Sequence, residues 1–382
     1  MNRASRTHFA DWWWTIDRLS AVIVIALIGI GLMLAVAASP AASGGPQTAG
    51  NFNFAARQMV FAIVALAILF GASLLRPEQL RRVAAIIFVA ALVGSFVVLF
   101  LGTQTLGARR WLDLRVFTLQ PSEFLKPSFA ILAAAILTDT NHTPLPRPVL
   151  TALIVAPALV ILMLQPDVGQ TFLLLGLWGA MLFFAGLSVK WVWAIGGGTA
   201  GLATFCYVFV PHVHHRVEQF LHPADKGHQV NMSLKAFSHG GLVGVGPGAG
   251  TVKYHLPDVH SDFIYAVAGE EFGLWLCAII ALLFCVLCVG LMLRSAKSRD
   301  PFAQLAGAGL AVVLAFQALI NMAVALNMIP AKGMTLPFIS SGGSSLFAVA
   351  LTMGFALSLS RERPQAELQK PRISPAYRGV RA

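Results

Sequence analysis

Most of the unusual polar residues in this chain lie in four short segments that separate long apolar runs. The four segments are GARRWLDLRVFTLQPSEFLKP (107–127), QPDVG (165–169), HLPDVHSDFIYAVAGEEFG (255–273) and PAKGMTLPFISSGGSS (330–345). Counting the apolar runs as membrane spans from the N-terminus places all four segments on the same side of a membrane. Ionisable groups at membrane depth are costly and mark functional sites, so we expect the four segments to form one site.

Asp262 is the strongest candidate for a catalytic residue. It stands at the start of an apolar run, directly before Phe263 and Ile264. A carboxyl group at that depth is partly desolvated, which raises its pKa and suits it to act as a general base. The structural alternative is that Asp262 caps the following helix, because Asp is a preferred N-cap residue and interacts favourably with the helix dipole.

Cations in the same segments suit an anionic substrate. Arg109 and Arg110 precede Trp111 in one segment, and Lys332 lies in another. Arginine binds phosphate oxygens as a bidentate fork and lysine binds them as a point charge, so these three residues are predicted to bind phosphate groups. The alternatives are solvated loop charges or an ion pair with Asp113.

Three more residues are candidates for substrate binding. Lys253 is a further cation in the connector that leads to Asp262, while Ser340 and Ser344 belong to the SSGGSS run at 340–345. The two glycines of that run would let backbone amides approach an anion closely. Glycine and serine also form ordinary flexible turns, and that alternative remains open.

Other charged residues of the segments are predicted to be structural or to face a partner protein. Glu123 and Lys126 open an apolar run, and Glu123 suits the first turn of a helix. Asp167 lies in a tight turn that Pro166 and Gly169 imply. There it either reaches the site or satisfies the amides of the turn.

Glu270 and Glu271 are also predicted to be structural. On one helix Glu270 would lie about 12 Å from Asp262 along the axis. Carboxyl pairs of glycosidases are about 5–9.5 Å apart, so the two residues are a poor acid and base couple. We expect at least one of the two glutamates to be the buried partner of a cation such as Arg57 or Lys126.

Histidine and cysteine residues do not predict a metal centre. Eight of the ten histidines lie between His212 and His260, including HVHH at 212–215, but they form no complete ligand set with the usual spacing. The cysteines all lie inside apolar runs and are expected to pack in the core.

Long apolar runs must position these residues. The chain has 382 residues, of which 57% are hydrophobic and 11% charged, and its mean hydropathy is +0.75. This composition excludes an ordinary soluble protein and predicts an all-α integral membrane protein, because runs of about 20 apolar residues form transmembrane helices. Ten helices are predicted, at 19–38, 54–75, 83–102, 124–139, 149–164, 170–186, 192–210, 263–293, 303–326 and 345–360.

The distribution of Lys and Arg predicts the orientation. A net charge of +11 would suggest nucleic-acid binding in a soluble protein, but most of the 27 Lys and Arg residues flank one side of the predicted spans. By the positive-inside rule both termini are cytoplasmic and the four segments face outward. The N-terminal run also resembles a signal peptide ending at AVA (35–37), but it exceeds the core of about 7–15 residues in such peptides.

Three parts are expected along the chain. They are a cytoplasmic segment (1–18), a single membrane domain (19–360) and a basic cytoplasmic tail (361–382). The composition of the tail predicts disorder. In the longest outer connector, 211–262, Val230, Leu234 and Phe237 recur at helical spacing, which predicts an amphipathic helix on the outer membrane–water interface.

Taken together, these segments resemble the SEDS family (shape, elongation, division and sporulation). The matching stretches, in family order, are ARRWLDL (108–114), QPSEFLK (120–126), QPDVG (165–169), the run 240–273 and PAKGMTLPFISSGGSS (330–345). The resemblance covers most of the chain, and ten spans with both ends inside also fit. KGMTLPFIS resembles the division branch more than the elongation branch, which usually lacks the lysine. Ser341 departs from the family, in which Tyr commonly precedes the two glycines.

The resemblance implies a peptidoglycan glycosyltransferase that polymerises lipid II during septal wall synthesis at cell division, in the bacterial inner membrane with its active face in the periplasm. It implies that Asp262 is the essential acidic residue. The family's other site positions correspond to Arg109, Arg110, Glu123, Lys126 and Lys332. The implied partners are the growing glycan strand, a class B penicillin-binding protein, other division proteins and membrane lipid, with no nucleic acid.

The residues agree with this chemistry. One base must remove the proton of the acceptor sugar hydroxyl, and Asp262 is the expected base. The lipid pyrophosphate leaving group needs positive charge, from the site cations or from a divalent cation such as Mg²⁺ or Mn²⁺, and no organic cofactor is expected.

Two alternatives come from other functional classes. A flippase that carries lipid II across the membrane would bind the same headgroup, but it should have polar residues along a path to the cytoplasmic side. A non-catalytic scaffold for the septal transpeptidase is the second alternative.

Overall fold

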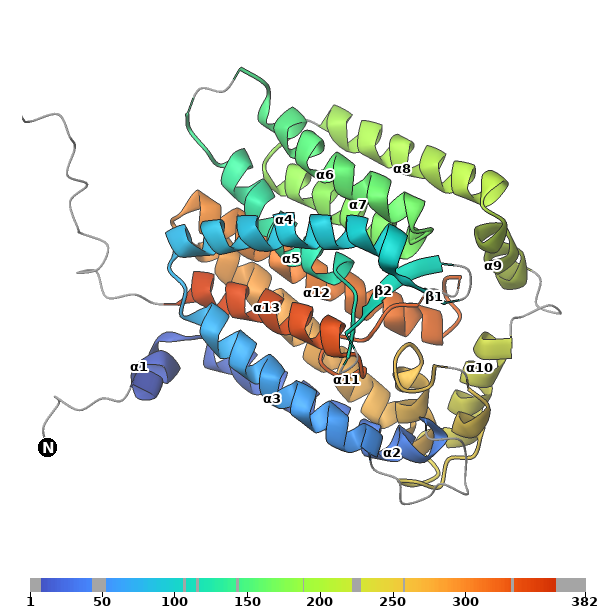
Figure 1. Ribbon diagram of the computed structural model, residues 1–382. Coiled ribbons are helices and arrows are strands. Elements are labelled where there is room, and N and C mark those ends of the chain that lie inside the picture. The colour runs from blue at the N-terminus through green and yellow to red at the C-terminus, as the bar shows by residue number, and fades with distance from the viewer. Residues whose placement is uncertain are drawn as a thin grey trace, which may run out of the picture.

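Long helices account for most of the structure (Figure 1). The computed structural model of the protein describes residues 8–42, 53–105, 108–114, 117–141, 144–187, 189–221, 228–256, 258–330 and 333–361. The basic tail after Arg361, for which the sequence predicts disorder, lies outside these ranges. A short helix, α1 (His8–Thr15), precedes the first long one.

Each of the ten predicted spans coincides with a helix. The helices are α2 (Arg18–Ala42), α3 (Asn53–Ser73), α4 (Pro77–Leu101), α5 (Ser122–Leu137), α6 (Arg147–Leu164), α7 (Val168–Phe184), α8 (Val189–Phe209), α11 (Ile264–Lys297), α12 (Pro301–Ala325) and α13 (Gly343–Ser360). Within the described ranges, seven of them are long and apolar enough to cross a membrane. Helix α7 and the 195–209 part of α8 are apolar but shorter, and α5 has 16 residues. The all-α membrane fold is therefore confirmed.

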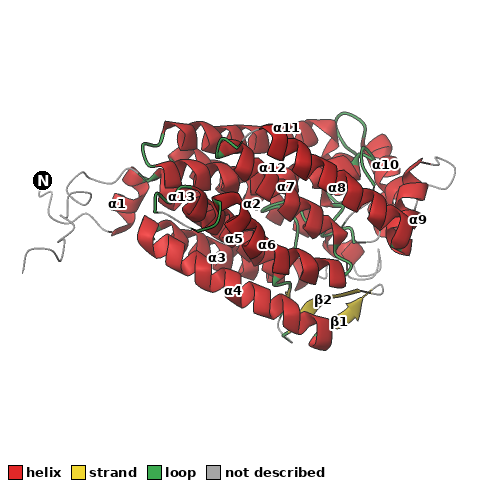
Figure 2. Ribbon diagram, turned by 90° about the horizontal axis from the view of Figure 1, so that it is seen from above, coloured by secondary structure: helices red, strands yellow, loops and turns green. Residues whose placement is uncertain are grey.

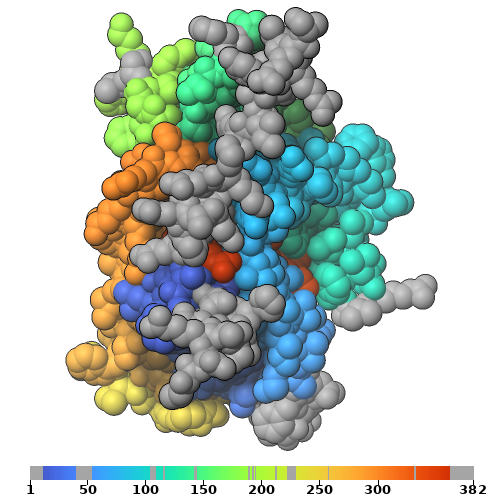
Figure 3. Space-filling model, turned by 90° about the vertical axis from the view of Figure 1, so that its left-hand side faces the viewer, coloured from blue at the N-terminus to red at the C-terminus, as the bar shows by residue number. Residues whose placement is uncertain are grey.

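Helix α13 lies in the middle of the bundle. It packs against α3, α5 and α12, and the long helices run roughly along one direction (Figures 1 and 2). From the end at which α13 terminates, its red surface shows only in small areas between segments of other colours (Figure 3). Its apolar window is 83% buried. A helix that is apolar on all sides and buried in this way forms the core of the bundle.

Small residues let this central region pack closely. A β-carbon at Gly354 of α13 would lie 2.6 Å from the β-carbon of Ala72 in α3. A β-carbon at Gly31 of α2 would lie 2.8 Å from the Cα of Ile339, just before α13. Helices in membranes associate largely through such close approach of their backbones. Helix α13 and the loop before it are therefore held firmly against α2 and α3.

Helix α11 is broken at Gly273, which has a positive φ of 76°. A side chain there would collide with the loop at 242–244, because a β-carbon would lie 2.5 Å from the amide nitrogen of Gly244. The amides of Leu274 and Trp275 donate to the carbonyls of Gly241 and Leu242 at 3.1 and 3.4 Å. The first part of α11 is thereby locked to the loop in front of it.

The remaining elements lie together at one end of the bundle, which we call the hairpin end (Figure 1). They are β1 (Thr103–Thr105), β2 (Ala108–Asp113), β3 (Thr118–Leu119), α9 (Pro211–Leu221), α10 (His228–Gly240) and the 3-10 helix η3 (Val252–His255). The strands form an antiparallel sheet in the order β1-β2-β3, which hydropathy did not predict. Helix α1 and the last turn of α13 lie at the opposite end. The four polar segments converge at the hairpin end, as expected.

The predicted amphipathic helix is α10, but its apolar face is used differently. The ring of Phe237 packs on Tyr265 of α11, with centroids 5.8 Å apart. The hydroxyl of Ser233 donates to the carbonyl of Ala325 in α12 at 2.7 Å. The apolar face therefore packs on α11 and α12, and the expectation that this face rests on the membrane surface is wrong.

Candidate active site

Asp262 lies in the short loop that precedes α11, at the hairpin end. The N-cap residue of α11 is Phe263, and no side chain caps this helix. The carboxylate of Asp262 is therefore not used as a helix cap. A β-carbon at Gly333 would lie 2.8 Å from its Oδ2 atom, so the loop before α13 leaves no room for a side chain beside the carboxylate.

The surroundings of Asp262 favour its protonated form. Burial raises the pKa of this carboxyl to about 7, the negative charge of Asp258 adds to that effect, and the positive charge of Arg216 opposes it. A base whose pKa lies near the working pH combines a useful ionised fraction with real proton affinity. Asp262 therefore has the properties that general-base catalysis needs.

Arg216 is the cation that the sequence did not single out. It lies half-buried on α9, and its charge interacts with Arg110, Asp262 and Asp167. It therefore stands between two groups of site residues that are far apart in the chain. No motif marks Arg216 in the sequence, because only the packing of α9 over the hairpin end brings it there.

Arg110 joins the hairpin to the turn before α7. Its guanidinium donates to the carbonyls of Pro166 at 2.5 Å and Gln165 at 3.4 Å, and lies 3.9 Å from the carboxylate of Asp167. Asp167 caps α7 through the amide of Gln170, and burial raises the pKa of Asp167 against the influence of Arg110. The structure thus brings Arg110 and Asp167 together, with much of the guanidinium already engaged.

Arg109 binds the end of α4 and not the loop of Asp262. It donates to the carbonyls of Leu99 and Phe100, each at 3.3 Å, in the last turn of α4. A cation at a helix C-terminus interacts favourably with the helix dipole. No contact between Arg109 and Asp262 occurs in the described part of the chain.

Glu123 and Lys126 form a buried ion pair with an N–O distance of 2.6 Å. Glu123 also accepts from Gln170 of α7 at 2.5 Å and from Gln317 of α12 at 3.2 Å. One carboxylate thus ties α5 to two neighbouring helices. Gln120, just before α5, donates to Asp167 at 3.3 Å and links this network to Arg110.

Lys253 has a different role from the expected one, and the two glutamates have different partners. Lys253 is fully buried, and its ammonium binds Glu271 and the carbonyl of Ala37, so it does not face a substrate. Glu270 accepts from the amides of Thr251, Val252 and Lys253 at 2.8–2.9 Å and from His239 at 3.0 Å. The glutamates are buried as expected, but their partners are Lys253 and His239. Arg57 and Lys126 are not their partners.

The serine and glycine run before α13 also differs from its expected role. Ser340 is buried, accepts from the amide of Leu336 at 2.7 Å and donates to the carbonyl of Ser261 at 2.5 Å. Ser344 is buried in the first turn of α13. A β-carbon at Gly343 would lie 3.3 Å from the ring of Phe61. The run is a packing element here, and neither serine is placed to bind substrate.

Two further expectations concern residues of the loops. Lys332 lies outside the described residues, although its chain neighbour Gly333 contacts Asp262. In the part of the chain that the structure describes, no three His, Cys, Asp or Glu side chains come close enough to hold a metal ion. Within HVHH, His214 stacks on Tyr207 and His215 bonds to Gln219.

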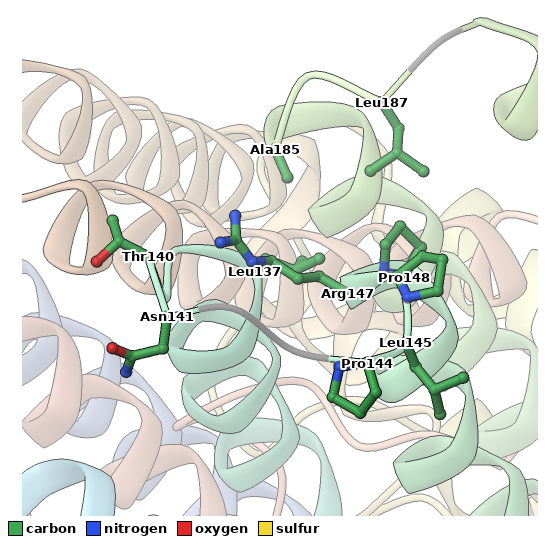
Figure 4. Close-up of a pocket in the computed structure, with 10 residues that line it drawn as sticks. Leu137, Thr140, Asn141, Pro144, Leu145, Arg147, Pro148, Ala185 and Leu187 are labelled. Atoms are coloured by element: carbon green, nitrogen blue, oxygen red, sulfur yellow. The ribbon is translucent and has the colours of Figure 1, made fainter.

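A pocket of about 640 Å³ lies at the end opposite to Asp262. It is lined by the α5–α6 loop, the start of α6 and the α7–α8 loop, and the side chain of Arg147 extends across it toward Leu137 (Figure 4). Pro144, Pro146 and Pro148 line one side and contribute no backbone donors. None of the predicted site residues lines this pocket.

Comparison with known proteins places this geometry in a family. The family model of the FtsW, RodA and SpoVE cell cycle proteins matches residues 18–365. The chain belongs to this family. It is 43% identical to the probable peptidoglycan glycosyltransferase FtsW of Caulobacter vibrioides, over 95% of this chain and 94% of that one. It is 33% identical to the probable peptidoglycan glycosyltransferase FtsW of Alkalilimnicola ehrlichii, over 96% of this chain and 94% of that one.

Solved structures of related chains share the fold. A chain of a peptidoglycan synthase complex that coordinates polymerization and crosslinking has a TM-score of 0.74 at 25% identity, covering 91% of this chain and 98% of its own. The rod shape determining protein RodA of Thermus thermophilus has a TM-score of 0.69 at 24% identity, covering 91% and 97%. Both family membership and the multi-pass membrane architecture are therefore established.

Proposed function

We propose that the protein is a peptidoglycan glycosyltransferase that polymerises lipid II during septal wall synthesis. The proposal rests on Asp262, which lies among cations at the end of a family-typical bundle. Burial raises the pKa of its carboxyl to about 7. Its relatives of 43% and 33% identity bear the name of this activity.

The proposed reaction uses each group once. Asp262 accepts the proton of the acceptor sugar hydroxyl as its oxygen attacks the anomeric carbon of the lipid-linked donor. The bond from that carbon to the pyrophosphate breaks, and the lipid pyrophosphate leaves with the bonding electrons. Arg216 and Lys332 stabilise the negative charge that develops on it, and the less engaged face of Arg110 contributes.

A divalent cation is a further proposal for the leaving-group side. Bound there, it would supply positive charge to the pyrophosphate oxygens. The carboxylate of Asp262 acts as the base and is not assigned to such an ion. With no cluster of three potential ligands among the described residues, most of its ligands would come from the pyrophosphate and from water.

Orientation and partners complete the proposal. The hairpin end faces the periplasm of the division septum, following the distribution of Lys and Arg. The partner is a class B penicillin-binding protein, and the similar chain from a peptidoglycan synthase complex supports a transpeptidase partner.

The polar network distinguishes a polymerase from a flippase. It extends from Arg110 through Asp167 to Glu123 and Gln317, and Gln317 lies about 12 Å from the end of α12 at Ala325. Beyond it toward the opposite end, Leu310, Leu314 and neighbouring buried side chains are apolar. A headgroup path across the bundle would need polar groups there as well, so the distribution favours chemistry at one end.

The test uses purified full-length protein, with and without its cognate penicillin-binding protein, and lipid II in detergent. Penicillin blocks crosslinking so that glycan chains are seen directly on gels. We expect polymer when both proteins are present. Absence of polymer in both preparations, with lipid II crossing the bilayer of proteoliposomes, would replace the proposal with the flippase.

A further inference from the structure

Three successive backbone carbonyls before α11 are held by side chains of other elements. The side chain of Ser341 donates to the carbonyl of His260 at 2.8 Å, and that of Ser340 donates to the carbonyl of Ser261 at 2.5 Å. The side chain of Asn321 donates to the carbonyl of Asp262 at 2.9 Å. The amide of Ser341 donates to the first carbonyl as well, at 3.0 Å. The backbone that carries Asp262 is therefore fixed from outside its own helix.

Asn321 is the most buried part of this arrangement. It lies near the end of α12 with a fractional exposure of 1%, and its Nδ2 atom also donates to the carbonyl of Met334 at 2.6 Å. One amide group thus joins the loop of Asp262 to the loop of Gly333. These are the two loops whose contact confines the carboxylate, because Gly333 has no space for a side chain there.

We propose that Asn321 is a positioning residue that sets the location of the Asp262 carboxylate, an inference that rests on the proposed function. With the carbonyl of Asp262 anchored, only the side-chain torsions of this residue remain to be set. Gly333 on one side restricts those torsions. Displacing a reacting group by about 1 Å can cost about 100-fold in rate, so the anchor has a large effect without touching substrate.

Asn321→Leu tests this role, because leucine has a similar size and no donors. We expect the kcat of polymerisation to fall about 10- to 100-fold, with little change in the KM for lipid II. Thr352→Val is the matched control. It removes another buried hydrogen bond from a side chain to a carbonyl, in the middle of α13, and should keep wild-type kcat.

The pH dependence of Asn321→Leu gives a second readout that loss of stability cannot imitate. The raised pKa of Asp262 depends on its burial and on its place near Asp258 and Arg216, so a displaced carboxyl should titrate at a different pH from that of wild type. Reaction of Asp262 with dicyclohexylcarbodiimide, located by mass spectrometry, reports the midpoint of this titration without lipid II. This second measurement separates the position of Asp262 from the identity of the substrate.

The outcomes are distinct. The inference is overturned if Asn321→Leu keeps wild-type kcat, or if it leaves the carbodiimide midpoint of Asp262 unchanged. A wild-type protein that makes no polymer, but whose carbodiimide midpoint shifts in Asn321→Leu, contradicts the proposed function and supports the positioning. If Asn321→Leu does not fold, Asn321→Ser decides through the same fall in kcat, and an unchanged kcat there overturns the inference.

Discussion

Glu123 ties α5 to α7 and α12 through one buried carboxylate. Its carboxylate neutralises Lys126 at 2.6 Å, and both side chains are almost fully buried. Glu123→Ala leaves an unpaired buried ammonium group, so we expect a loss of about 3–5 kcal/mol in the free energy of unfolding. Denaturant unfolding in detergent measures it.

The matched control is Glu78→Ala, in the first turn of α4, where the residue is exposed. Loss of its helix-dipole interaction costs about 0.3–1 kcal/mol. Equal stability of the two variants would show that the pair with Lys126 does not hold α5 in place.

Gly333 gives a prediction about activity. A β-carbon at this position would lie 2.8 Å from Oδ2 of Asp262, so Gly333→Ala must displace either the loop or the carboxylate. We expect a fall in polymerisation of about 10-fold or more with unchanged thermal stability. Gly71→Ala, where a β-carbon meets no atom within 4 Å, is the control and should keep full activity. Full activity of Gly333→Ala would place the reacting carboxylate elsewhere.

Residue types predicted part of the site, and long-range contacts decided the rest. Asp262 was a candidate because a carboxyl at the start of an apolar run is costly to desolvate, and the structure removes the alternative of a helix cap. Lys253 was misassigned because its partner Glu271 and the carbonyl of Ala37 meet it only in the fold. Arg216 was missed because a cation in a polar connector is usually solvated. Only the packing of α9 brings its charge near those of Asp262 and Asp167.

At the scale of elements, Lys253 fastens η3 to α11. Lys253→Met removes the partner of Glu271 and leaves that buried carboxylate unpaired. We expect faster amide hydrogen exchange at 250–256 and a loss of about 3–5 kcal/mol in stability. Lys235→Met, an exposed residue on α10, is the control. Unchanged exchange at 250–256 in Lys253→Met would mean that Glu270 alone holds η3.

Helices were predictable to different degrees for a physical reason. Apolar runs mark all ten long helices because the hydrocarbon interior requires them. The break of α11 at Gly273 and the hairpin β1–β3 depend on close backbone contacts and strand pairing. Hydropathy contains no information about either, and so the elements that shape the site were the least predictable.

At the scale of the whole molecule, orientation is the testable property. Val243, at the hairpin end, is 79% exposed, while Lys190 begins α8 at the other end. In a background in which the exposed Cys285 is replaced by serine, Val243→Cys should react with a membrane-impermeant thiol reagent in cells with a permeabilised outer membrane. Lys190→Cys should react only after lysis. The reverse pattern would place the candidate site in the cytoplasm.

The pH dependence of polymerisation by wild type and Asp262→Asn tests the central claim most directly. Because the pKa of Asp262 is raised to about 7, the carboxyl is protonated below that pH and cannot accept a proton. The wild-type rate should therefore rise with pH through about 7 and then level off. Asp262→Asn should lower the rate by about 100-fold or more and abolish this rise, while stability is retained. Near-normal polymerisation by Asp262→Asn, with the same pH profile as wild type, would contradict the assignment of Asp262 as the base.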